Sequence, residues 1–286
     1  PGFQGVPMWY VIRFFITQMA NEVVSLRASA VAYNFFLALI PSFIFLFTLI
    51  PYFPIENIDQ VIMMFLKEYM PTEAYKTIEH TVQDILVKRR TGLLSIGFLF
   101  TIYFATNGIY SLLDAFNQEQ GRPFTLKWLT ALGLMVALSF LLVIGTFVYI
   151  VFEVLLYQLI DPHFFQYPPN YYIFQSIQIL ILFAIIFIGV SMLYFFGPYR
   201  KENRPPLFSP GSIIATVLMV ITGSGFAFYV DNFSQYNKFY GSLGALIILM
   251  IWLYINAMVL IIGYEINQSI MMAKQFREDH SRKLYK

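Results

Sequence analysis

Few side chains in this sequence could carry out chemistry, and those that stand out are ionisable residues close to or inside long apolar runs. They are Arg27, Asp114, Glu153, Asp231 and Glu265. A charge at the centre of a bilayer costs roughly 2.5 to 3.5 kcal/mol or more, so such residues normally face a cavity or pair with one another. Glu265 is the most unusual, because it ends a stretch without charged residues that begins after Lys238.

Their places in the apolar runs divide these residues into two layers. Arg27, Asp114 and Glu265 should lie toward the cytoplasmic face, and Glu153 and Asp231 toward the outer face. The inner layer has two interpretations. It is either a structural ion pair, most simply Arg27 with Glu265 or Asp114, or a polar gate or protonatable site for coupled transport. We favour the structural pair and keep the gate as the functional hypothesis.

Other residues extend this candidate site. Asn107, Asn256 and Asn267 offer amide groups for hydrogen bonds between helices. Pro41 lies in the middle of the first apolar run, where it removes a helical hydrogen bond to the Leu37 carbonyl and predicts a kink or local unwinding. A hinge or a carbonyl exposed to a cavity would account for this proline, and so would an ordinary packing kink.

Several kinds of chemistry have no support in the sequence. It contains no cysteine, which excludes thiolate catalysis and disulfides, and its histidines have no metal-ligand spacing. Walker, HExxH and GxSxG motifs are absent. The net charge of +2 comes without a basic patch, which argues against nucleic acid. We expect no catalytic residue, no metal and no cofactor.

The composition sets the class of protein. Hydrophobic residues make up 58% of the 286 residues and charged residues 12%, whereas soluble domains are about a quarter charged. The apolar runs reach the roughly 20 residues that a spanning helix needs, and lipid offers no partners for other backbone structures. The predicted spans are 28–53, 91–117, 128–160, 171–197, 210–231 and 240–272. The sequence therefore predicts an all-α, polytopic membrane protein with a single transmembrane domain over residues 1–286.

Two segments outside the spans have helical periodicity. In residues 8–26 an apolar stripe (Trp9, Ile12, Ile16, Met19 and Val23) faces a polar one. It indicates either a helix in the membrane interface or an amphipathic helix packed on the bundle. The link 55–90 predicts two amphipathic helices separated by Pro71, acting as a fixed cap or as a lid.

The distribution of basic residues predicts the orientation. Basic residues occur in the N-terminal segment, in the links after the second and fourth spans and in the tail, all on one side of a six-span protein. Both termini should therefore be cytoplasmic. The sequence VKRR at 87–90 disagrees, but the majority outweighs it.

Small residues in the last two spans have the spacing that lets helices approach closely. They are Gly223 with Ala227 and Gly241 with Ala245. Because such faces serve packing within one chain and between chains equally well, the oligomeric state is unknown.

Several motifs together resemble the YihY/BrkB-type membrane proteins. They are AYNFFLALIP (32–41), SPG (209–211), YGSLGALIILMIWLY (240–254) and GYEIN (263–267), and their order and spacing extend the resemblance over nearly the whole chain. The resemblance implies six spans in a bacterial inner membrane and a transporter-like function, although members have also carried a ribonuclease label. Carried over to this sequence, it emphasises Tyr33, Pro41, Tyr240, Gly241, Glu265 and Asn267. Tyr264 departs from the family pattern, in which a small residue commonly precedes the acid.

Three functional hypotheses remain. The first is a transporter of a small solute or a lipid, with membrane lipid as its surroundings and a polar cavity between its helices. The second is a non-transporting membrane scaffold in which the polar layer holds helices together. A membrane-bound nuclease is the weakest, since no acid-base pair beside a basic RNA groove is present.

Overall fold

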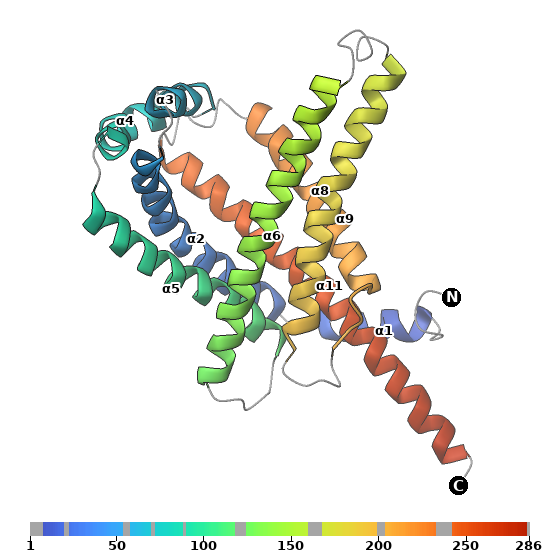
Figure 1. Ribbon diagram of the computed structural model, residues 1–286. Helices are drawn as coiled ribbons and strands as arrows, with labels where there is room; N and C mark the ends of the chain where they lie inside the picture. Colours follow the sequence, from blue (N-terminus) through green and yellow to red (C-terminus); the bar gives the residue numbers. More distant parts are fainter. Residues whose placement is uncertain are drawn as a thin grey trace. The chain divides into compact units, whose positions relative to one another are not determined.

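The computed structural model is helical throughout its regular elements over the residues that it describes, which are 8–19, 23–53, 58–69, 72–87, 90–117, 124–159, 168–198, 204–232 and 242–284. The elements are α1 (Met8–Met19), α2 (Val23–Leu49), a short 3₁₀ helix η1 (Ile50–Tyr52), α3 (Ile58–Tyr69), α4 (Thr72–Val87), α5 (Thr91–Phe116), α6 (Phe124–Leu159), α8 (Pro168–Phe196), α9 (Pro210–Asn232) and α11 (Ser242–Leu284) (Figure 1). The predicted all-α class is confirmed.

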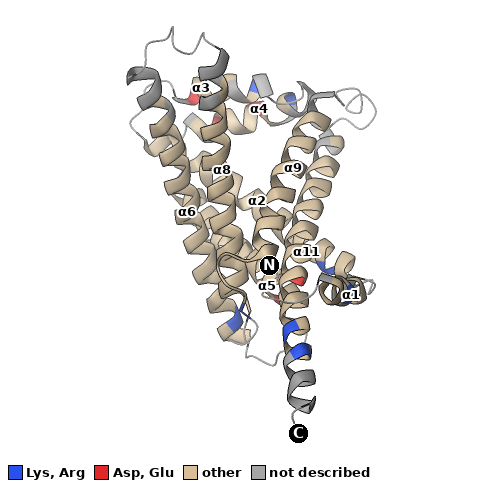
Figure 2. Ribbon diagram, turned by 90° about the vertical axis from the view of Figure 1, so that its right-hand side faces the viewer, with Lys and Arg blue, Asp and Glu red and all other residues tan. Residues whose placement is uncertain are grey.

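Six of the described helices are long and apolar enough to cross a membrane. These segments are Val24–Tyr52, Thr91–Phe116, Phe124–Phe152, Gln175–Phe196, Pro210–Tyr229 and Leu246–Arg277. They match the six predicted spans in order. Figure 2 shows how rarely acidic or basic residues interrupt the helices, and α8 contains none at all. With 43 residues, α11 is about 65 Å long, so its charged C-terminal part must extend beyond a hydrocarbon core about 30 Å thick.

The chain divides into two compact units. The first comprises residues 1–24, 113–221 and 259–286, and the second comprises 25–112 and 222–258. Helices α5, α9 and α11 each contribute residues to both units. The single transmembrane domain expected over residues 1–286 stays a prediction.

In the first unit, α6 and α8 run side by side in opposite directions (Figures 1 and 2). Gly145 allows this approach, because a Cβ atom there would lie only 2.8 Å from Ile185 Cδ1. Further along the same pair, a Cβ at Gly189 would lie 3.5 Å from Leu141. Small residues therefore set the separation of these two helices.

In the second unit, α2 packs against α5 in the opposite direction. A Cβ at Gly97 would lie 3.4 Å from the Phe45 backbone, and a Cβ at Gly108 would lie 3.1 Å from the Phe35 ring. The helices α3 and α4 pack on each other and on η1 (Figure 1). Two helices in the link 55–90 are thus as predicted, while their role as cap or lid stays a prediction.

Helix α2 continues through its proline. It is helical from Val23 to Leu49 with Pro41 buried inside it, so the local unwinding considered above does not occur there. The loss of one backbone hydrogen bond is tolerated in a spanning helix when the rest of the helix remains intact.

Candidate functional site

Buried polar groups gather in the first unit, where the start of α9 packs against α11. Asn267 lies at the centre and is only 2% exposed. Its Oδ1 accepts a hydrogen bond from the Gly211 backbone N–H at 2.9 Å, and its Nδ2 donates to Ser209 Oγ at 2.9 Å. The predicted role of Asn267 in hydrogen bonding between helices is confirmed.

The sequence SPGS explains why α9 begins at this point. Ser209 is the N-cap, Pro210 occupies the first helical position, and Ser209 Oγ accepts the Ser212 N–H at 3.2 Å. In return, Ser212 Oγ accepts the Ser209 N–H at 3.2 Å, which makes a reciprocal capping box with serine in place of glutamate. The Gly211 N–H is a further unpaired donor of the first turn, and Asn267 satisfies it.

Two glycines let the helices meet at this joint. A Cβ atom at Gly211 would collide with the Gly263 carbonyl oxygen and would lie 2.6 Å from Asn267 Cγ. A Cβ atom at Gly263 would collide with the Tyr194 hydroxyl and would lie 2.6 Å from Ala215 Cβ. Tyr194 is fixed in turn, because its hydroxyl donates to the Leu260 carbonyl at 2.7 Å.

The small residues chosen from the sequence are not the ones at this joint. A Cβ added at Gly223 would meet no atom within 4 Å among the described parts of the chain, so no described helix approaches closely there, and packing against another chain stays a prediction. Gly241 lies outside the described residues. The spacing of small residues marks a helix face but does not say whether another helix covers it. Gly211 and Ala215 have the same spacing and were overlooked.

An aromatic cluster lies beside this joint. The Tyr264 ring stacks on Phe116 with 4.3 Å between centroids, and Tyr194 meets Phe116 edge-on at 5.6 Å. Gln268 Nε2 donates to the Tyr264 hydroxyl at 2.7 Å. Tyr264, the departure from the family pattern, is thus a buried member of the packing around Glu265.

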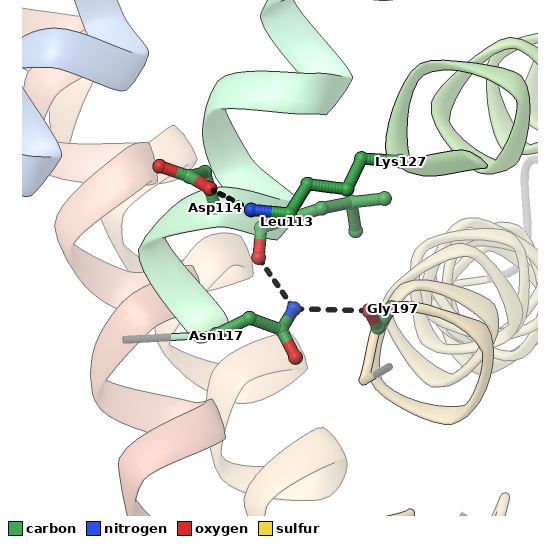
Figure 3. Close-up of polar contacts among 5 residues, drawn as sticks. All are labelled: Leu113, Asp114, Asn117, Lys127 and Gly197. Atoms are coloured by element: carbon green, nitrogen blue, oxygen red, sulfur yellow. Dashed lines mark hydrogen bonds and ion pairs between the residues drawn. The ribbon is translucent and has the colours of Figure 1, made fainter. Parts of the chain in front are cut away.

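The ends of α5 and α8 are joined by a single carboxamide (Figure 3). Asn117 Nδ2 donates to the Leu113 carbonyl at 2.6 Å and to the Gly197 carbonyl at 3.1 Å. One side chain therefore satisfies carbonyls at two helix C-termini, where unpaired acceptors would otherwise remain. No local pattern in the sequence singles out Asn117.

Asp114 has a partner that was not predicted. Lys127 Nζ lies 3.3 Å from Asp114 Oδ1, across the link between α5 and α6 (Figure 3). The Asp114 side chain is 53% exposed, so this acid is at the edge of the first unit and not in its interior. Arg27 belongs to the second unit, and its pairing with Glu265 or Asp114 stays a prediction.

Among the candidate acids whose side chains the structure describes, Glu265 is buried and Asp114 is exposed. Glu265 is 4% exposed and lies on α11 between Tyr264 and the Asn267 joint, and Ser269 Oγ donates to its backbone carbonyl at 2.7 Å. An acid that is buried inside a spanning helix is a candidate for proton binding. The contacts of the neighbouring Tyr264 and Asn267 hold this part of α11 in place.

The structure places only some of the other predicted site residues. Tyr33 on α2 is 54% exposed. Among the described residues, Asn256 donates to the Trp252 carbonyl of its own helix. Glu153 and Asp231 lie on α6 and α9, but their side chains are not described, and Tyr240 and Gly241 lie outside the described residues. Across the described part of the chain, no group of three or more histidines or acids could hold a metal ion.

Comparison with known proteins identifies relatives along most of the chain. The family model described as virulence factor BrkB matches residues 15–284. A Bacillus subtilis protein named "Putative ribonuclease-like protein YfkH" is 29% identical, with 89% of this chain and 92% of that protein covered. A membrane protein of Vibrio campbellii and one of Coxiella burnetii, both of the UPF0761 group, are each 24% identical, with 93% and 91% of this chain and 84% and 93% of those proteins covered. No solved structure matches.

Proposed function

The chain belongs to the BrkB virulence factor family of membrane proteins, and from this premise we propose that it carries a small solute or a lipid across the bacterial inner membrane. Both termini face the cytoplasm in this proposal, which is supported by the excess of Lys and Arg on one side of the six spans.

The observation that carries the proposal is the buried carboxyl group of Glu265. It lies in the segment Leu246–Arg277, which is long and apolar enough to span a membrane. Ionisable residues inside spanning helices are costly, and besides pairing with other polar groups they mark substrate paths and proton relays.

Contacts on both sides of Glu265 would hold its helix in place while the carboxyl group gains or loses a proton. Asn267, two residues further on, holds α11 to the start of α9, and Tyr264, one residue before, packs on Phe116. Protonation would remove the negative charge without requiring the helix to move. Coupling of that proton to cargo would make the protein a proton-linked transporter.

The test is transport by purified protein in liposomes, with fluorescent phospholipids for lipid movement and a trapped pH dye for proton movement. We expect the wild type to show movement that Glu265→Gln abolishes while its melting temperature stays close to wild type. Asp114→Asn is the matched control, because Asp114 is an acid of the same unit whose side chain is exposed. Equal movement in wild type and Glu265→Gln would contradict the proposed role of Glu265.

A scaffold without transport activity is the alternative. It is favoured by the Asn267 carboxamide, because both its oxygen and its nitrogen make hydrogen bonds that hold α11 to the start of α9. No movement of lipids, protons or solutes in liposomes, together with a partner protein that co-purifies in fixed ratio, would establish this alternative and overturn transport.

The name of the Bacillus relative includes the word ribonuclease, and we propose that the present chain is not a nuclease. Support comes from the sequence, in which the net charge of +2 comes without a basic patch that could bind RNA. Ribonuclease activity that survives stringent purification and disappears on substitution of a single acid would overturn this proposal.

A further inference from the structure

Helix α1 has two apolar faces, and one of them is already used. Val11 is buried against Ile270 and Ala273 of α11, with Ile266 beside them. The Tyr10 ring lies 6.0 Å from the Phe276 ring. Figures 1 and 2 both show α1 beside the C-terminal part of α11. The sequence predicted either a helix in the membrane interface or a helix packed on the bundle. The face of α1 that carries Val11 packs on α11, as the second prediction expects.

The opposite face of α1 remains exposed. Trp9 is 70% exposed, Ile12 38% and Ile16 59%. Steps of three and four residues place these side chains on one stripe of the helix. A stripe of this kind that begins with Trp is typical of helices lying in the interface between lipid and water.

Basic side chains accompany this stripe. Arg13 is exposed on α1, and Lys274 and Arg277 are exposed on the part of α11 next to it. Neither α1 nor residues 268–277 contain an acid, whereas Glu278 and Asp279 follow directly in the tail. The described charged residues of α1 and of residues 268–277 are therefore all basic.

We infer that α1 and residues 270–277 of α11 form a binding site for the anionic surface of a lipid bilayer. The exposed stripe enters the interface, and Arg13 and Lys274 bind lipid phosphates. A twelve-residue helix is about 18 Å long, too short to span the membrane but able to lie along it.

The covalent connection supports lipid as the occupant. Only residues 20–22 separate α1 from α2, and the apolar segment at Val24–Tyr52 begins there. The stripe is therefore tethered within a few residues of the bilayer, where the lipid surface is always available. This inference does not depend on transport, and its test needs no substrate.

The absence of cysteine makes the test direct, since single cysteines can be introduced and spin-labelled. Ile16→Cys reports on the stripe. Thr17→Cys is the matched control, because Thr17 is exposed next to the stripe and its hydroxyl donates a hydrogen bond to the Arg13 carbonyl of the same helix. Both are reconstituted in phosphatidylcholine with or without phosphatidylglycerol. Label collisions with oxygen, which concentrates in lipid, are compared with collisions with a water-soluble nickel chelate.

We expect the label at position 16 to favour oxygen and the label at position 17 to favour the nickel chelate. Phosphatidylglycerol should increase the membrane-bound fraction of α1, and Arg13→Gln and Lys274→Gln should each reduce this increase by roughly fivefold. Equal access of the nickel chelate to both positions would show that the stripe faces water, and protection of position 16 from both reagents would show that protein covers it. Either result overturns the inference, and an unchanged bound fraction with phosphatidylglycerol overturns the choice of anionic lipid.

Discussion

Asn267 of α11 donates to the hydroxyl of Ser209 at 2.9 Å, and Ser209 is the residue that caps α9. The cap of one spanning helix is therefore held by a side chain of another. The same carboxamide accepts the N–H of Gly211, so it compensates for a donor that the start of α9 leaves unpaired. This joint fixes where α9 begins relative to the segment of α11 that carries Glu265.

Replacing Asn267 by leucine keeps a side chain of similar size and removes both hydrogen bonds. The Gly211 N–H would then be buried without a partner, and we expect a loss of about 1–2 kcal/mol in the free energy of unfolding. Asn256→Leu is the control, because Asn256 bonds only within its own helix in the contacts seen here and is partly exposed. The measurement is the melting temperature in detergent, and equal values for the two variants would contradict the assignment.

Glycine-to-alanine substitutions test the close approach of α9 and α11. Gly211→Ala and Gly263→Ala should each destabilise the protein strongly, because the new methyl group would collide with a backbone carbonyl or with the Tyr194 hydroxyl. Gly133→Ala is the matched control within α6, where a Cβ would meet no atom of the described residues within 4 Å. That change should be neutral or should stabilise the helix by up to about 1 kcal/mol. Thermal unfolding of the three variants side by side would show the difference, and a stable Gly211→Ala protein would disprove the close contact.

Apolar length and composition were sufficient to predict the six spanning helices, because a bilayer permits little else. The joint between α9 and α11 was harder to predict. The sequence SPG contained a recognisable cap and first-turn proline, but nothing local showed that Asn267, more than fifty residues away, completes it. Gly223 and Gly211 look alike in sequence, and only the packing of the folded chain distinguishes an open glycine from one in contact. Side-chain partners that lie far apart in the sequence, such as Asn117 and Gly197, carry no local signal.

Two substitutions of Tyr264 distinguish the contribution of its ring packing from that of its hydrogen bond. Tyr264→Phe removes only the bond from Gln268 and should cost about 1 kcal/mol, while Tyr264→Ala also loses the stack on Phe116 and should cost about 3–5 kcal/mol. Tyr33→Ala is the control, because Tyr33 is largely exposed. Chemical or thermal unfolding in detergent would rank the three variants. A Tyr264→Ala protein as stable as Tyr33→Ala would mean that the aromatic cluster contributes nothing to the fold.

The contacts at the ends of α5 and α8 predict a clear order of effects. Asn117→Ala leaves the Leu113 and Gly197 carbonyls without their shared donor in a buried place, so we expect a loss of about 1–3 kcal/mol. Lys127→Gln breaks the ion pair with the exposed Asp114 and should cost less than about 1 kcal/mol. Salt screens exposed pairs, so the effect of Lys127→Gln should shrink further at high ionic strength while that of Asn117→Ala should not. Melting temperatures at low and high salt would test this order. A larger effect from Lys127→Gln would show that the ion pair between α5 and α6 stabilises the protein more than the carboxamide that joins α5 to α8.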